Sequence, residues 1–83
     1  MTRPEMSILF DYYGPLLTAV QRDCWDLCYN EDLSLSEIAE LKGISRQAAW
    51  DNIRHAEAKL TEFEEKTGLV KRITELEEIV NGL

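Results

Sequence analysis

A glycine between two short amphipathic segments is the feature that most constrains the fold of this 83-residue chain. Before Gly43, the pair Ser34-x-x-Glu37 forms a capping box, in which a serine hydroxyl and a glutamate carboxylate satisfy free N–H groups at a helix start. After it, Ser45 is placed to cap a second helix. Because glycine adopts the left-handed conformation without strain, the sequence predicts two helices joined by a sharp turn at Gly43.

The residues around this turn have the spacing of a helix-turn-helix. Ala39 is small where two helices must cross closely, Ile44 is expected to point into the core, and Ala49 is expected to pack against the first helix. We therefore predict a helix-turn-helix over about residues 34–60. An ordinary helical hairpin with the same spacing is the alternative.

The rest of the chain is also predicted to be helical, because no stretch alternates apolar and polar residues as a strand does. Gly14-Pro15 ends a first helix, and Thr18-x-x-Gln21 is a second capping box. The predicted fold is all-α: a small helical bundle with a helix-turn-helix unrelated to winged helices, and a C-terminal helical tail. The predicted helices span about residues 6–13, 18–30, 34–42, 46–67 and 69–83.

Apolar residues three and four positions apart predict which helix faces are buried. Lys42 stands where a helix-turn-helix often has a hydrophobic residue, and Leu41 is expected to take over its packing. Aromatic residues at helical spacing, such as Tyr12, are expected in the core, whereas Trp50 is expected to be partly exposed. The predicted stripes are Met6, Leu9, Phe10 and Tyr13; Leu17, Val20, Cys24 and Leu27; Leu35, Ile38, Ala39 and Leu41; and Ala49, Ile53, Ala56, Leu60 and Phe63.

The charge distribution limits the kinds of partner. The formal net charge of −7 argues against a protein that relies on broad electrostatic attachment to phosphates. Residues 1–33 carry −4, residues 34–43 carry −1 and residues 61–83 carry −3, while residues 44–60 carry +1. The predicted second helix of the helix-turn-helix therefore begins in the one segment that is not negative.

The start of that helix is the candidate binding site. In proteins that read DNA, residues at this place enter the major groove, and arginine and glutamine suit guanine and adenine respectively. The alternative is that Arg46 and Gln47 are solvated residues of a first turn; an exposed Trp50 would then favour a protein partner. The predicted nucleic-acid-binding or partner-binding residues are Ser45, Arg46, Gln47, Ala48, Asp51, Asn52 and Arg54.

The last segment carries a second candidate surface. Its apolar residues alternate steps of four and three, which is typical of a short coiled-coil seam or of a helix docked on a partner. Because short chains gain stability by oligomerisation, we expect a homodimer. Thr67-Gly68 divides the predicted helix-turn-helix domain, residues 1–67, from this tail, residues 68–83. The predicted stripe consists of Leu69, Ile73, Leu76, Val80 and Leu83.

No arrangement for catalysis, metal binding or a cofactor is apparent in the sequence. His55 is the single histidine, and it is expected on the surface of a long helix. Cys24 and Cys28 lack further ligands at metal-site spacing, so we expect two buried, reduced thiols. No apolar run has the roughly 20 residues needed to cross a bilayer, and the first residues lack a signal-peptide pattern, so we expect a cytoplasmic protein without membrane insertion.

Several stretches carry a family resemblance: residues 9–13 (LFDYY), 16–18 with 21–22 (LLT and QR), 29–39 (YNEDLSLSEIA) and 45–54 (SRQAAWDNIR). Over about residues 6–72 the chain resembles the YlxM family of small bacterial proteins. The resemblance implies an all-helical fold similar to the promoter-reading region four of sigma factors. It also implies a regulatory role, and a protein partner, in the signal recognition particle pathway.

Two features differ from the family pattern. Ala49-Trp50 stand where a larger aliphatic residue and a tyrosine are usual, and the tail after Arg72 is shorter than usual. We expect a non-enzymatic regulatory protein that acts through its helix-turn-helix and through protein contacts. The alternatives are a sequence-specific DNA-binding regulator and a structural dimerisation module.

Overall fold

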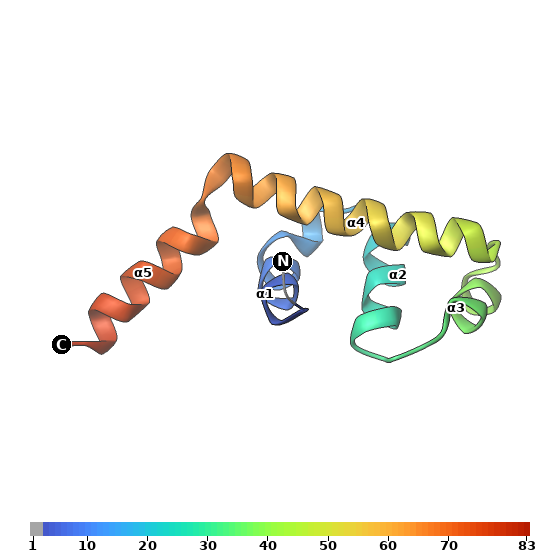
Figure 1. The fold of residues 1–83 in the computed structure, drawn as a ribbon, viewed down its shortest axis with the longest axis horizontal. Coiled ribbons are helices and arrows are strands. Elements are labelled where there is room, and N and C mark those ends of the chain that lie inside the picture. Colours follow the sequence, from blue (N-terminus) through green and yellow to red (C-terminus); the bar gives the residue numbers. More distant parts are fainter. Residues whose placement is uncertain (1–2) are drawn as a thin grey trace.

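The computed structural model describes the backbone of residues 3–83 and the side chains of residues 5–83. This part of the chain contains five α-helices and one 3-10 turn and has no strand, so the predicted all-α class is confirmed. Figure 1 shows α4 running along one side of the molecule, with α1, α2 and α3 packed against it and α5 turning away from its far end. The elements are α1 (Arg3–Tyr13), η1 (Gly14–Leu16), α2 (Ala19–Tyr29), α3 (Leu35–Lys42), α4 (Arg46–Thr67) and α5 (Leu69–Asn81).

The capping patterns place the helix starts where they were predicted. The Ser34 hydroxyl accepts a hydrogen bond from the Glu37 N–H at 3.2 Å, and the Glu37 carboxylate accepts one from the Ser34 N–H at 3.1 Å. Thr18 and Gln21 form the same reciprocal pair at the start of α2. Each pair satisfies two N–H groups that have no partner within the helix, which stabilises the helix end by about 1 kcal/mol.

The turn of the helix-turn-helix depends on the backbone of Gly43. Gly43 has φ +67°, and an added Cβ would meet no atom within 4 Å. The left-handed backbone, not lack of space, is therefore what favours glycine here. After the turn, the Ile44 N–H donates to the Ala39 carbonyl at 3.0 Å, and the Ser45 hydroxyl caps α4 by accepting from the Ala48 N–H.

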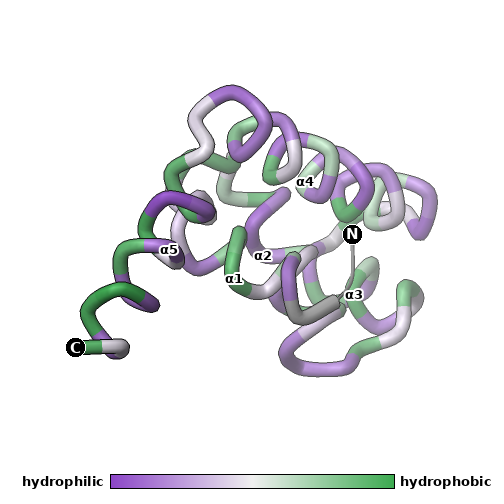
Figure 2. Tube along the Cα trace, turned by 60° about the vertical axis from the view of Figure 1, so that its left-hand side comes forward, coloured by the Kyte–Doolittle hydropathy of each residue, from purple (hydrophilic) through white to green (hydrophobic). Residues whose placement is uncertain are grey.

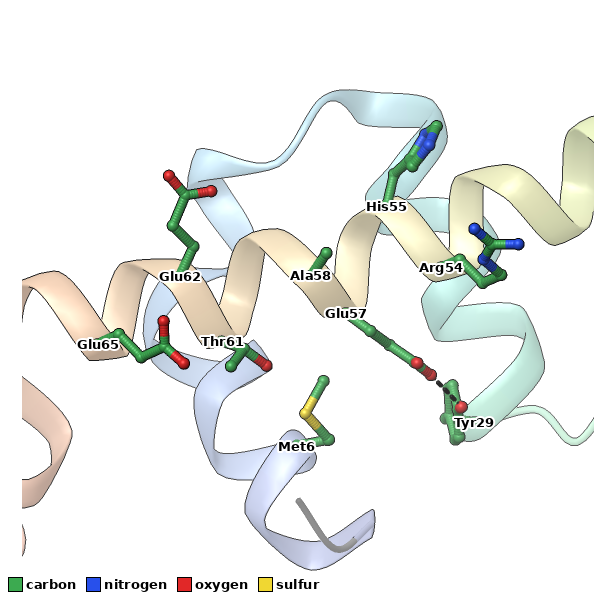
Figure 3. Close-up of a pocket in the computed structure, with 9 residues that line it drawn as sticks. All are labelled: Met6, Tyr29, Arg54, His55, Glu57, Ala58, Thr61, Glu62 and Glu65. Carbon is green, nitrogen blue, oxygen red and sulfur yellow. Dashed lines mark hydrogen bonds between the residues drawn. The ribbon is translucent and has the colours of Figure 1, made fainter.

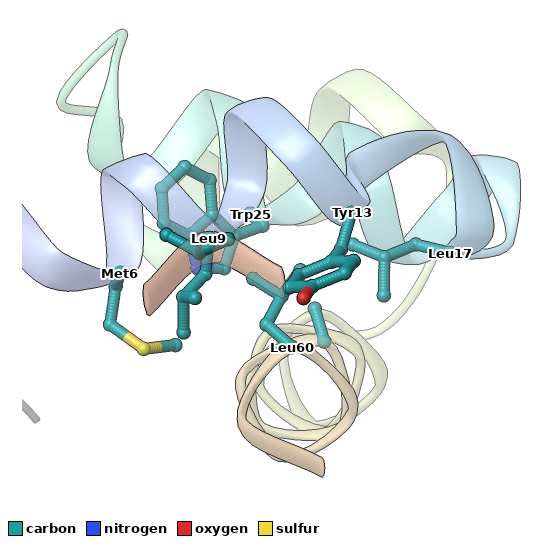
Figure 4. Close-up of a cluster of buried hydrophobic side chains, with 8 residues drawn as sticks. Met6, Leu9, Tyr13, Leu17, Trp25 and Leu60 are labelled. Carbon is teal, nitrogen blue, oxygen red and sulfur yellow. The ribbon is translucent and has the colours of Figure 1, made fainter. Parts of the chain in front are cut away.

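The core consists of two clusters that lie under different parts of α4. Figure 4 shows the larger cluster, where α1 and α2 meet the middle of α4. In it the Trp25 ring stacks on Phe10 with 4.3 Å between ring centroids. The smaller cluster lies under the helix-turn-helix. The larger contains Met6, Leu9, Tyr13, Leu17, Trp25, Ala56, Leu60 and Val70, and the smaller contains Cys24, Ile38, Ala49 and Ile53.

The predicted buried face of α2 was wrong at its first turn. Val20 was expected in the stripe but is 36% exposed, whereas Gln21, Cys24 and Trp25 are buried. The buried face of α2 therefore keeps Cys24 but includes Gln21 and Trp25 in place of Val20. Stacking between Trp25 and Phe10 accounts for this difference, because the indole ring contributes more buried apolar area than a valine side chain.

The expected packing of Leu41 was also wrong, because its side chain is 67% exposed. The neighbouring Lys42 is half-buried instead, and its ammonium group lies 2.7 Å from a carboxylate oxygen of Asp23 on α2. A lysine stem can cover apolar surface while its charged end reaches a carboxylate. Tyr12 was expected in the core and is exposed as well, on the outer side of α1.

The junction of α4 and α5 is held by a carboxylate from the preceding helix. Gly68 has φ +60° and offers no side chain to cap α5. The Glu64 carboxylate accepts hydrogen bonds from the Val70 N–H at 3.1 Å and from the Lys71 N–H at 3.0 Å. It also accepts one from the Tyr13 hydroxyl at 2.6 Å, which connects the start of α5 to α1.

These contacts shift the pKa of both groups. Burial opposes ionisation of Glu64, but the hydrogen bonds from Tyr13, Lys71 and Val70 together hold its pKa below the usual value. Burial, followed by the nearby Glu64 carboxylate, raises the pKa of Tyr13. Glu64 is therefore an ionised acceptor and Tyr13 a neutral donor at neutral pH.

The molecule is elongated, with principal extents of 50 × 23 × 19 Å. Among the helices that the structure describes, none combines the length and apolar character needed to cross a membrane.

Candidate functional site

The predicted site residues lie on the first turns of α4 or cap it. The Ser45 hydroxyl is used as the helix cap, where it accepts from the Ala48 N–H at 3.0 Å. Arg46 and Gln47 are exposed in the first turn, and Ala48 is half-buried behind them. The helix-turn-helix therefore presents one guanidinium and one amide outward, as a protein that reads a groove does.

The two amide side chains of this surface already have partners within α4. The Gln47 amide nitrogen donates to the Asp51 carboxylate at 2.9 Å. The Asn52 amide nitrogen donates to the Ala48 carbonyl at 2.9 Å. Each amide nitrogen has a second N–H, and each amide oxygen has no partner in these two bonds, so the bonds within α4 fix the orientation of both side chains without using all of their hydrogen-bonding groups.

Trp50 forms the apolar centre of the exposed surface. Its side chain is 44% exposed, as expected from the sequence, and the Arg54 guanidinium lies 5.8 Å from the centroid of its ring. This distance is within the range of a cation–π contact, which holds the arginine beside the ring. A hollow of about 540 Å³ lies next to the indole and is lined by Leu35, Arg46, Gln47 and Trp50. Leu35 was predicted only as a core residue of α3, and its place in this hollow was not foreseen.

A larger hollow of about 740 Å³ lies farther along α4 (Figure 3). Met6 from α1 and Tyr29 from α2 contribute to its wall, and the Tyr29 hydroxyl donates to the Glu57 carboxylate. His55 borders the hollow and is exposed, as predicted. The remaining lining residues are Arg54, Ala58, Thr61, Glu62 and Glu65.

The side chains that could bind a metal do not converge. Within residues 5–83, no group of three or more histidine, cysteine, aspartate or glutamate side chains is arranged to hold an ion. Cys24 is buried as expected, whereas Cys28 was expected to be buried and is half-buried; neither forms a disulfide. Burial raises the pKa of Cys24 above its ordinary value, which keeps the thiol protonated and unreactive at neutral pH.

The predicted apolar stripe of α5 is largely uncovered. Figure 2 shows hydrophobic and hydrophilic residues alternating along this helix. Val70 is buried against the body and Ile73 is half-buried, so only the first turns of α5 are anchored. The exposed apolar residues of α5 and the chain end are Leu69, Leu76, Ile79, Val80 and Leu83.

A comparison with family models matches residues 1–83 to UPF0122, described as "Putative helix-turn-helix protein, YlxM / p13 like". A UPF0122 protein of Thermoanaerobacter sp. strain X514 is 51% identical over 86% of this chain, which spans 61% of that relative's length. UPF0122 protein YlxM of Bacillus subtilis strain 168 is 47% identical over 95% of this chain and 72% of its own length. A UPF0122 protein of Bacillus cereus strain AH187 is 49% identical over the same shares. The chain belongs to the UPF0122 family of YlxM/p13-like helix-turn-helix proteins.

Proposed function

We propose that this protein is a non-enzymatic, cytoplasmic regulator that binds a protein partner in the signal recognition particle pathway through the exposed face of α4. The observation that carries the proposal is Trp50, a large aromatic side chain that is exposed beside two arginines on the outward face of a helix-turn-helix. Trp and Arg are the residues most enriched among those that dominate protein–protein binding. The choice of pathway comes from the family resemblance.

The charge of this surface supports a protein partner over a DNA groove. Gln47 and Asn52 are bonded within α4, and Asp51 places a carboxylate on the same surface. A duplex presents two phosphate charges for each base pair, whereas residues 44–60 carry a net charge of only +1. Trp50 and the hollow beside it instead suit an apolar anchor of a partner protein.

The test is direct binding to the purified GTPase of the signal recognition particle. We expect the Trp50→Ala variant to bind about tenfold more weakly or worse, because a truncated aromatic anchor usually costs more than 1 kcal/mol. Leu41→Ala is the matched control, since it removes another exposed apolar side chain of the same motif and is expected to leave affinity within about twofold. Equal binding by both variants would contradict the proposal.

Sequence-specific DNA binding is a second candidate, favoured by the exposure of Arg46 and Gln47 in the first turn of α4. On this alternative, Arg46→Ala weakens binding to a duplex, and affinity falls steeply between about 50 and 200 mM salt. Binding to the particle's GTPase would change little over the same range of salt. Measuring both ligands with the same variants separates the two candidates.

Dimerisation through α5 is the third candidate, favoured by its uncovered apolar residues. On this alternative, the homodimer is itself the functional unit and the stripe from Leu69 to Leu83 is its seam. Sedimentation velocity at rising protein concentration tests it. A sedimentation coefficient that stays at the monomer value up to about 100 μM would contradict it.

A further inference from the structure

A second candidate surface lies between α1 and α5, away from the helix-turn-helix. A groove of about 460 Å³ separates these helices, and Ile8, Leu9 and Val70 contribute its apolar surface. Leu9 and Val70 are buried in the core, whereas Ile8 is 45% exposed. The remaining lining residues are Glu5, Glu64, Lys71, Thr74, Glu75 and Glu78.

Exposed apolar residues extend beyond the groove on α1. Ile8 and Tyr12 lie four residues apart, on one face of this helix, and both are exposed. Leu16, in the 3-10 turn that follows α1, is exposed as well. The groove and these side chains together form an apolar surface that an amphipathic helix could cover.

The charges around this surface indicate which chemical groups a partner must carry. Four of the groove's lining residues are glutamates, and Lys71 is its single basic lining residue. Asp11 adds an exposed carboxylate next to Tyr12 in the chain. Lysine and arginine side chains can lay their stems on apolar surface while their charged ends reach such carboxylates. Phosphate groups would be repelled by the same residues.

A second copy of this chain fits the surface poorly. The exposed apolar residues of α5 are accompanied by Glu75, Glu77 and Glu78, so placing that helix on the groove would bring carboxylates together. The one segment with a net positive charge, residues 44–60, carries only +1. A positively charged partner would complement the glutamates of the groove, whereas a second copy of this chain would not.

We propose that the groove between α1 and α5, with the exposed side chains of Ile8 and Tyr12, binds a basic amphipathic helix of another protein. The apolar face of that helix covers Ile8 and Tyr12, and its lysines or arginines lie against Glu75 and Glu78. This site is separate from the surface around Trp50 and does not depend on the function proposed for it.

The test uses a fluorescein-labelled synthetic helix of about 16 residues, with leucines on one face and lysines elsewhere, and the full chain. Fluorescence anisotropy at about 150 mM salt gives its affinity. We expect the double variant Glu75→Lys/Glu78→Lys to bind about tenfold more weakly, and Ile8→Ser to lose a similar factor. Trp50→Ala is expected to leave this affinity unchanged.

The matched control is Glu31→Lys/Glu40→Lys, which makes the same change in net charge at exposed positions outside the groove. We expect it to weaken binding by less than about twofold, and we expect a peptide with glutamates in place of lysines to gain affinity for the Glu75→Lys/Glu78→Lys variant. Equal losses in the two double variants would mean diffuse attraction and would overturn the proposal. It would also be overturned if Ile8→Ser dissociated an oligomer without changing peptide affinity, because the groove would then be an interface between copies.

Discussion

At the scale of single residues, Glu64 holds the junction between α4 and α5. Its carboxylate accepts hydrogen bonds from two N–H groups at the start of α5 and from the Tyr13 hydroxyl of α1. The Tyr13 hydroxyl also lies 2.6 Å from the Thr67 hydroxyl. One side chain therefore provides the cap that Gly68 cannot provide and connects three helices.

We predict that Glu64→Gln destabilises the fold by roughly 1 kcal/mol at neutral pH, because glutamine offers one acceptor oxygen where the carboxylate offers two. The pKa of Glu64 is lower in the folded chain than in the unfolded one. Its stabilising effect is therefore present above the unfolded-state pKa and is lost as pH falls through the folded-state pKa. Urea unfolding at about pH 7 and about pH 3 should show a difference between wild type and variant that shrinks in acid.

The neighbouring substitution Glu65→Gln is the control for this effect. Glu65 is exposed and is expected to leave the stability within about 0.5 kcal/mol of wild type at both pH values. A difference between wild type and Glu64→Gln that stays constant from neutral to acid pH would show that the carboxylate's charge is unimportant.

At the scale of helices and turns, the sequence predicted the features formed by neighbouring residues. It did not predict the contacts between residues far apart in the chain. The capping boxes at Thr18 and Ser34 and the turn at Gly43 depend on residues at most a few positions apart, so the sequence predicts them directly. Lys42 meets Asp23 on another helix, 19 positions away. Such a pair depends on how α3 packs against α2, which no local spacing specifies.

The sequence likewise predicted one part of the candidate site, the residues that lie together on α4, and missed the contribution of α3. The order of residues along α4 predicts that Arg46, Gln47 and Trp50 are presented together, since they occupy its first turns. It does not predict that Leu35 of α3 lines the hollow beside the indole, because that requires the crossing geometry of the two helices. It also does not predict whether the Gln47 amide bonds with Asp51 or stays free.

We predict that Gly43→Ala lowers the free energy of unfolding by about 1–2 kcal/mol, since an L residue other than glycine is strained at φ +67°. Gly43→Asn should cost less, because asparagine tolerates the left-handed region better than alanine does. Urea denaturation of the three proteins measures both differences. If Gly43→Asn lowered the free energy of unfolding more than Gly43→Ala, the cause would be a steric clash. That result would contradict the structure, in which an added Cβ at Gly43 meets no atom within 4 Å.

We predict that the Lys42–Asp23 pair contributes less than about 1 kcal/mol, because both side chains are partly exposed and their attraction is screened by water. A double-mutant cycle with Lys42→Met and Asp23→Asn isolates the coupling, since methionine keeps most of the packing of the lysine stem. The coupling should fall further at about 1 M salt. A coupling free energy above about 2 kcal/mol would contradict this prediction, because it would mean that water screens the pair much less than the exposure of its side chains indicates.

At the scale of the whole molecule, the two candidate surfaces lie toward opposite ends of a body 50 Å long. The surface around Trp50 lies on the first turns of α4, and the groove is lined by residues of α1, α5 and the last turns of α4. Figure 1 shows the start of α4 and its junction with α5 at opposite ends of that helix. They also differ in charge, since residues 44–60 carry +1 and residues 61–83 carry −3. If both proposals hold, we expect the two surfaces to bind different partners, since one carries a net positive charge and the other a net negative charge.

The same arrangement makes α5 the least protected helix of the monomer. Only Val70 is buried on it, whereas Ala49, Ile53, Ala56 and Leu60 are buried on α4. Amide groups in elements with few buried contacts open and exchange with solvent more readily. We predict that hydrogen exchange at about 5 μM protein is fast over residues 76–81 and slow over residues 49–60.

Concentration then distinguishes a monomer from a dimer that pairs through α5. If copies associate through the exposed stripe, protection of residues 76–81 should rise as the protein is concentrated toward about 500 μM, because association stabilises the helix by mass action. The variant Leu76→Lys/Val80→Lys should remove that rise while leaving residues 49–60 protected, since both side chains are exposed in the monomer. If the rise persists in this variant, another surface joins the copies; if wild type shows no rise, α5 remains uncovered until a different protein binds it.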